Sequence, residues 1–136
     1  MRIVLVLLLG VAAPAWSQPL EPGEWELTTT TASPVLTKSQ SKTFKRCLKK
    51  EDADNPEALL SREANKNDCK VTPGARAGDT YNWEVSCAKP RVRGTGTATV
   101  RGNSLQSEMQ LKLEVQGQNL PLTARTTGRR LGACQT

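Results

Sequence analysis

The sequence of 136 residues contains no histidine, and aromatic residues make up only 4% of it. Histidine is the side chain most often used for proton transfer near neutral pH, and it is a common zinc ligand. Aromatic side chains form the stacking platforms that bind single-stranded nucleic acid. The length leaves no room for a second independent core. We therefore expect neither histidine-dependent catalysis, nor nucleic-acid binding, nor a multidomain architecture.

Long apolar runs are absent except at the N-terminus, where residues 3–13 are uncharged and hydrophobic. A positive charge at Arg2 precedes this run, and the small residues Ala15 and Ser17 follow it. This pattern predicts a signal peptide over residues 1–17, cleaved after Ser17. The alternative, a membrane anchor, needs about 20 apolar residues. We expect residues 18–136 to form a single domain, soluble after signal removal, in the bacterial periplasm or secreted.

All four cysteines follow the predicted cleavage point, at Cys47, Cys69, Cys87 and Cys134. An even number of cysteines in an exported chain predicts structural disulfides. A redox motif of the Cys-x-x-Cys type is absent, and a zinc site would need four separated thiolates. Three pairings of four cysteines are possible. We expect Cys47–Cys69, which would staple the helical segment between them, and Cys87–Cys134, which would hold the C-terminus.

Apolar and polar residues alternate along much of the chain, and this period of two is typical of half-buried strands. The clearest case is residues 105–115, where Leu105, Met109, Leu111 and Leu113 share one face. A turn signal at residues 101–104 precedes this strand. The further strands that we expect span residues 24–31, 39–49, 81–87, 94–100 and 120–126, with a turn at 117–119.

One short helix is expected over residues 55–62, because Asn55 is a good N-cap and Pro56 suits the first helical position. Two glycines, Gly94 and Gly96, interrupt a threonine-rich strand and predict a bend or bulge. The expected fold is mainly β: an antiparallel sheet of five to seven strands, curved or closed into a partial barrel, with one short helix and two disulfides.

Short motifs spread over residues 22–134 together resemble a bacterial family of small exported proteins, domain of unknown function 3617. The sequence departs from this pattern at Leu105, where the resemblance leads us to expect an aromatic residue. The resemblance implies a location in the cell envelope or outside the cell, and it transfers no catalytic residue. The motifs are Pro22-Gly23-Glu24-Trp25-Glu26, Cys47-Leu48, Asp68-Cys69, Trp83 before Cys87, Gly94-x-Gly96 and Gly128 to Cys134.

Candidate catalytic residues are few. Ser39 and Lys42 have the spacing of a serine–lysine pair, but an activated serine needs a buried base. Glu24 and Glu26 share one strand face, and the same alternation makes them solvent-exposed acids beside inward-facing neighbours. We expect no enzyme, no cofactor and no metal site.

Two kinds of residue are candidates for binding. Trp25 and Trp83 either fill the core or line a cavity inside the curved sheet. A group of basic residues either forms a surface for an anionic partner or only keeps the protein soluble, given a net charge of +6. This basic group comprises Lys45, Arg46, Lys49, Lys50, Arg129 and Arg130, with further cations at Lys38, Lys42, Arg91, Arg93, Arg101 and Arg125.

The sequence therefore favours a non-catalytic binding or interaction protein whose outer face meets a partner in the cell envelope. One alternative is a carrier that holds an apolar or amphipathic small molecule in the concavity of the sheet. Another alternative is an inhibitor of an envelope-directed hydrolase such as lysozyme. Lysozymes are usually cationic, however, so they would repel a chain that is itself cationic.

Overall fold

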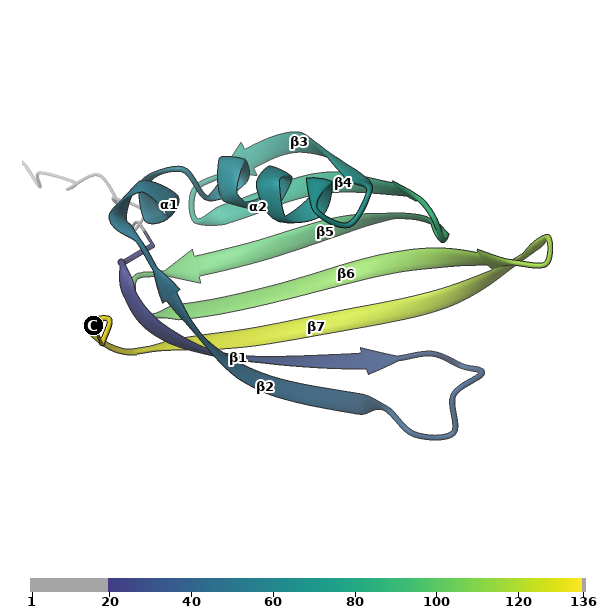
Figure 1. Cartoon of the computed structure of the whole chain (residues 1–136), viewed down its shortest axis with the longest axis horizontal. Helices are drawn as coiled ribbons and strands as arrows, with labels where there is room; N and C mark the ends of the chain where they lie inside the picture. The colour runs from purple at the N-terminus through teal and green to yellow at the C-terminus, as the bar shows by residue number, and fades with distance from the viewer. Residues whose placement is uncertain (1–19, 136) are drawn as a thin grey trace, which may run out of the picture.

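Seven antiparallel strands form one curved sheet in a computed structural model that describes residues 20–135 (Figure 1). The predicted signal peptide lies outside these residues. The strand order is β2-β1-β7-β6-β5-β4-β3, so β2 and β3 are opposite edges and the sheet does not close. The mainly β, antiparallel fold is thus confirmed. The strands are β1 (Gly23–Ala32), β2 (Gln40–Leu48), β3 (Cys69–Ala77), β4 (Thr80–Ala88), β5 (Arg91–Arg101), β6 (Ser104–Val115) and β7 (Gln118–Gly132).

Tight turns join the central strands where glycine relieves backbone strain. Gly102, with φ of 58°, lies between β5 and β6, as expected. Gln116 and Gly117, with φ of 50° and 77°, turn the chain from β6 into β7 one residue earlier than predicted. Both turns have the two-residue length that matches the natural twist of a hairpin.

Two helices, rather than the single one expected, carry the chain from edge strand β2 to edge strand β3: α1 (Lys50–Asp54) and α2 (Pro56–Asn65). The side chain of Asn55 accepts a hydrogen bond of 3.1 Å from the backbone N–H of Ala58, and Pro56 stands at the start of α2. The predicted cap is therefore confirmed. Because α2 lies against β3, it covers one face of the sheet near that edge (Figure 1).

Removing the cap of α2 gives a first test of this local structure. We expect Asn55→Ala to lower the free energy of unfolding by about 1 kcal/mol, the usual cost of losing an N-cap. Urea denaturation measures the change. Asn65→Ala, at the other end of α2, is the control because the Asn65 side chain makes no hydrogen bond within the described chain. An equal loss in both variants would contradict the assigned cap.

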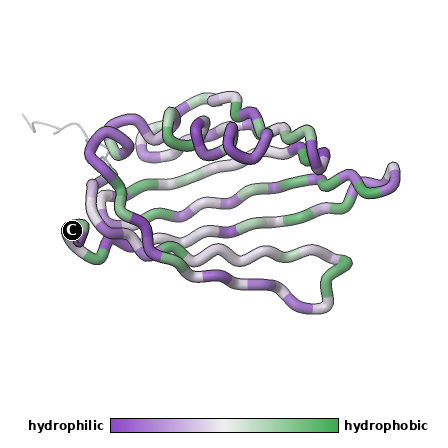
Figure 2. The backbone as a smooth tube through the Cα atoms, in the orientation of Figure 1, coloured by the Kyte–Doolittle hydropathy of each residue, from purple (hydrophilic) through white to green (hydrophobic). Residues whose placement is uncertain are grey.

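Hydropathy varies along the strands (Figure 2), and the strand register gives the sheet an inner face, on which the helices pack, and an outer face that is polar. Trp25, Leu48 and the α1 residue Ala53 form the buried cluster on the inner face. Most other inward-facing apolar side chains are only half-buried. Within residues 20–135, the buried hydrophobic residues are Trp25, Leu48, Ala53, Trp83 and Val100.

The two disulfides pair the cysteines differently from the expected arrangement. The bonds are Cys47–Cys134 and Cys69–Cys87. Cys69 and Cys87 face each other directly in the register of β3 and β4. Strand β1 lies between β2 and β7, and the chain after β7 passes the start of β1 to reach Cys47. The expected pairs, Cys47–Cys69 and Cys87–Cys134, are therefore wrong.

The expected bend or bulge at Gly94 and Gly96 is also absent. Both residues lie inside β5, in unbroken register with β4 on one side and β6 on the other. A Cβ atom at Gly96 would overlap the indole ring of Trp83, and one at Gly94 would overlap the carbonyl oxygen of Gln110. These glycines are needed for close packing, not for a change of strand direction.

Candidate functional site

A cavity of about 280 Å³ lies between α2 and the inner face of the sheet. Five elements supply its walls, and most of the lining side chains are apolar. The Cys69–Cys87 disulfide closes one side of the cavity and ties β3 to β4. The lining residues are Leu60, Glu63, Ala64, Asn67, Cys69, Val71, Trp83, Val85, Cys87, Val92, Met109 and Leu111.

The sequence produces this cavity through two periodicities. Leu60 and Ala64 are four residues apart, so they share the side of α2 that faces the sheet. Val71 and Val85 are cross-strand neighbours on the inner face, and Trp83, two residues before Val85 on β4, lies on the same face. The small side chain of Ala64 and the branched valines leave space that longer side chains would fill.

Trp83 forms a wall of the cavity and is 7% exposed. Its indole ring packs over Gly96, the position on the neighbouring strand where any Cβ would collide with the ring. The indole Nε1–H is buried and has no acceptor within residues 20–135. Burying such a donor without a partner costs about 1–3 kcal/mol.

Trp25 has the opposite character, although nothing in the sequence distinguishes the two tryptophans. It is 3% exposed and packs against Leu48 and Ala53, away from the residues that line the cavity. Its Nε1–H donates a hydrogen bond of 2.9 Å to the backbone oxygen of Glu21. Trp25 is therefore a satisfied core residue, and Trp83 is the tryptophan that lines a cavity.

Glu63 contributes a carboxylate to the cavity wall and connects α2 to the far edge of the sheet. Arg46 on β2 donates a hydrogen bond of 2.9 Å to Glu63 Oε1, and Lys66 donates one of 3.2 Å to the same atom. The Arg46 hydrogen bond, followed by that from Lys66, lowers the pKa of Glu63 below its ordinary value. The carboxylate therefore stays ionised at neutral pH and loses these partners only under acidic conditions.

The charge of the cavity restricts what can enter it. No lysine or arginine is among the lining residues, and Glu63 is the one ionised side chain there. Because Arg46 and Lys66 are already paired with Glu63, a carboxylate or phosphate buried in the cavity would find no free cation among the lining residues. The cavity therefore suits an uncharged apolar molecule, or one with a neutral oxygen atom. Within residues 20–135, no group of three potential metal ligands comes together.

Of the six basic residues singled out in the sequence, four are divided between the two faces of the sheet, and Lys49 and Lys50 lie at the start of α1. Arg46 and Arg130 lie on the inner face, whereas Lys45 and Arg129 lie on the outer face on either side of Glu26. Four of the six are in ion pairs, which join Arg46 to Glu63, Lys50 to Asp54, Arg129 to Glu26 and Arg130 to Glu21. Lys45 and Lys49 are exposed and have no ion pair in the described chain.

The remaining sequence candidates are dispersed. Ser39 precedes β2 and Lys42 lies within it, both exposed, with no hydrogen bond between them in the described chain. Glu24 and Glu26 lie on the outer face of β1, and Arg129 holds Glu26 in an ion pair of 3.1 Å. The structure therefore brings neither pair into an arrangement with a buried base.

Most lining residues of the cavity were not singled out in the sequence. Leu60, Met109 and Leu111 were expected only as apolar positions of a helix and a strand. Their apolar spacing indicates that they point to the same side, but it does not show that a cavity remains between them. That cavity depends on the distance between α2 and the sheet, which is set by the crossover from β2 to β3. Among the lining residues, the sequence singles out Trp83 as a candidate for binding, and Cys69 and Cys87 as disulfide cysteines.

Comparison with known proteins places the chain in a family without an assigned activity. No curated protein and no solved structure matches it. No helix within residues 20–135 is long and apolar enough to cross a membrane. Residues 20–134 match the family described as a protein of unknown function, DUF3617. The match covers nearly all of the described residues, and the chain belongs to the DUF3617 family.

Proposed function

We propose that this protein is a non-catalytic binding protein of the periplasm or the secreted fraction, and that it holds an uncharged amphipathic small molecule between α2 and the sheet. The export pattern of residues 1–17 supports the location, and so do the two disulfides, which are typical of oxidising compartments. The carrier is favoured over an envelope-partner or inhibitor role because a specific cavity supports it.

The observation that carries this proposal is the buried Nε1–H of Trp83, which lacks an acceptor. Native proteins rarely leave buried donors unpaired, and each exception calls for an explanation. A ligand with a carbonyl or hydroxyl oxygen would supply the missing acceptor once the indole shifts away from Gly96, against which its Nε1 packs. Its apolar part would then contact the valine, leucine and methionine side chains of the same cavity.

The size of the cavity limits the ligand. Small-molecule sites have volumes of about 300–1,000 Å³, and the cavity of about 280 Å³ is at the lower end. A short alkyl chain or a single ring fits this volume. The half-buried Leu113, Leu120 and Leu122 continue the apolar inner face beyond it, so a longer chain would extend along the strands.

The test compares the two tryptophans with 1-octanol as the probe. We expect 1-octanol to shift the indole N–H resonance of Trp83 in an NMR titration and to leave that of Trp25 in place. In calorimetric titrations, Trp83→Phe should weaken 1-octanol binding about tenfold, the effect of one lost hydrogen bond. The unfolding free energy of this variant should not fall by more than about 0.5 kcal/mol, because removing the unpaired donor offsets the lost packing of the larger ring over Gly96.

Trp25→Phe is the matched control, since it makes the same chemical change at a satisfied site. It should lower the free energy of unfolding by about 1 kcal/mol through the lost bond to Glu21, with 1-octanol binding unchanged. Octanoate should bind more weakly than 1-octanol because no cation lines the cavity. The proposal would be refuted if 1-octanol shifted both indole resonances equally, or if Trp83→Phe bound 1-octanol as tightly as the unchanged protein. It would also be refuted if a second copy of the chain covered the inner face.

A further inference from the structure

On the outer face of the sheet, nearly all arginines form ion pairs with carboxylates. Four of them form ion pairs: Arg91 with Glu114 at 3.4 Å, Arg101 with Asp79 at 3.1 Å, Arg125 with Glu108 at 3.2 Å and Arg129 with Glu26 at 3.1 Å. In each pair a cation of β5 or β7 meets a carboxylate of a neighbouring strand or turn. Each of these four arginines is therefore compensated by a neighbouring carboxylate.

Arg93 is the exception. It lies on the outer face of β5 directly opposite Lys112 of β6, and it forms no ion pair within residues 20–135. On its other side it faces Ser86 of β4, which in turn faces Lys70 of β3. Lys70, Arg93 and Lys112 thus form one row across four strands, which we call the cationic row. Like charges directly opposite each other in a sheet are destabilising, and the nearby Glu84 pairs with none of them in the described chain.

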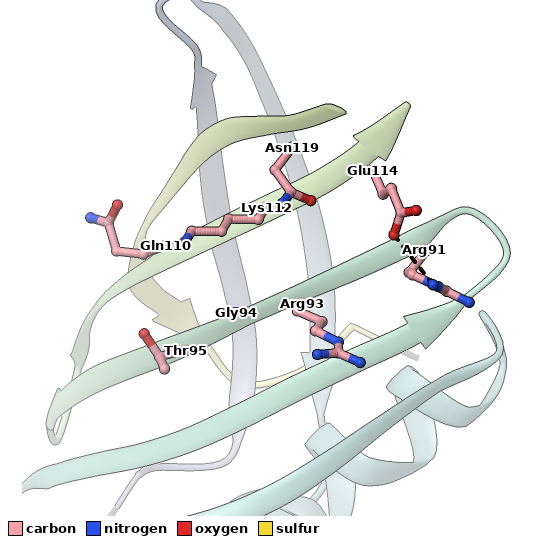
Figure 3. A pocket seen from close by; sticks show the side chains of 8 residues that line it. All are labelled: Arg91, Arg93, Gly94, Thr95, Gln110, Lys112, Glu114 and Asn119. Carbon is pink, nitrogen blue, oxygen red and sulfur yellow. Dashed lines mark hydrogen bonds and ion pairs between the residues drawn. The ribbon is translucent and has the colours of Figure 1, made fainter. Parts of the chain in front are cut away.

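The cationic row borders two hollows of the outer face. One, of about 620 Å³, is lined by Arg93 and Lys112, by the hydrogen-bonding side chains of Thr95, Gln110 and Asn119, and by the Arg91–Glu114 ion pair (Figure 3). The adjoining one, of about 500 Å³, contains Lys70, Ser86 and Arg93, with one carboxylate, Asp68, and Arg91 also in its lining. In Figure 3 the dashed line joins Arg91 to Glu114, while the charged ends of Arg93 and Lys112 point in different directions.

We propose that the cationic row is a binding site for a phosphate group. The planar guanidinium of Arg93 would donate two parallel hydrogen bonds to phosphate oxygens, and Lys112 would supply a point charge from the adjacent strand. An anion between them would remove their repulsion, and Thr95 and Gln110 would complete the contacts. The phosphate belongs either to a soluble compound or to a lipid headgroup, and this site is independent of the cavity under α2.

The experiment uses inorganic pyrophosphate as the soluble probe, and vesicles of phosphatidylcholine with or without phosphatidylglycerol as the lipid probe, at low ionic strength. We expect Arg93→Gln and Lys112→Gln each to weaken binding about tenfold. Arg125→Gln removes the same charge from the same face but from an existing ion pair, so its binding should match that of the unchanged protein. Pyrophosphate should raise the melting temperature of the unchanged protein and of Arg125→Gln, but not that of Arg93→Gln or Lys112→Gln.

Each outcome of these binding experiments either supports or overturns the proposed phosphate site. Binding of pyrophosphate alone, lost in the two row variants, supports a site for soluble phosphate compounds. Binding only to vesicles with phosphatidylglycerol, lost in the same variants, supports a site for lipid headgroups. An equal loss in Arg125→Gln would show a general effect of net charge and would overturn the proposal. Failure of the unchanged protein to bind either probe would overturn it as well.

Discussion

Replacing both Cys47 and Cys134 by serine should lower the free energy of unfolding by about 4.5 kcal/mol. The Cys47–Cys134 bond spans 87 residues, and the stabilisation by a disulfide grows with the length of the loop that it closes in the unfolded chain. The bond also fixes the end of β7 to β2 around the start of β1. Because single domains are stable by about 5–15 kcal/mol, we expect this variant to be close to unfolding. Urea denaturation followed by circular dichroism measures the change.

The second disulfide provides the matched comparison. Cys69–Cys87 spans only 18 residues, so the corresponding double serine variant should lose about 3 kcal/mol. Peptide mapping without reduction would verify the pairing before the measurement. A larger loss in the Cys69/Cys87 variant, or peptides that link Cys47 to Cys69, would contradict the assigned arrangement.

Trp25→Ala should be nearly as damaging, with a loss of about 4 kcal/mol in the free energy of unfolding. Trp25 is 3% exposed and is the largest member of the buried cluster with Leu48 and Ala53. The substitution removes this packing, leaves a void beside α1 and deletes the hydrogen bond to Glu21. So few hydrophobic residues are buried that the remaining core should not compensate.

Leu131→Ala is the control for Trp25→Ala. Leu131 is 42% exposed, so truncating its side chain should change the free energy of unfolding by less than about 0.5 kcal/mol. Chemical denaturation of both variants under identical conditions gives the comparison. A loss below about 1 kcal/mol in Trp25→Ala would mean that the cluster at the α1 end is not the core of the domain.

The central strands were predictable because apolar and polar residues alternate along them in the sequence. Residues 105–115 show it most clearly, and β6 spans Ser104–Val115. The sequence does not indicate strand β3, because Pro73 and Gly74 are unfavourable in strands. The structure tolerates them because β3 is an edge strand, and its register with β4 shifts between Pro73 and Arg76. Helix α1 was missed because its five residues are too few to show a helical period.

The disulfide pairing and the site depend on contacts between distant parts of the chain. Cys47 approaches Cys134 only because β1 pairs with β2 on one side and with β7 on the other. Local spacing carries no information about this order. The charges of Arg46 and Arg129 were visible in the sequence, but their acidic partners, Glu63 and Glu26, follow from the fold. Trp83 and Trp25 are alike in the sequence, and only the structure shows that the Trp25 indole N–H has an acceptor whereas that of Trp83 has none in the described chain.

Native mass spectrometry of protein recovered directly from the cells that produce it tests the central claim most directly. The account predicts that part of the protein carries a noncovalently bound, uncharged small molecule, and that Trp83→Phe recovered in the same way carries much less of it than Trp25→Phe does. A single mass equal to that of the bare oxidised chain in all three samples would contradict the account.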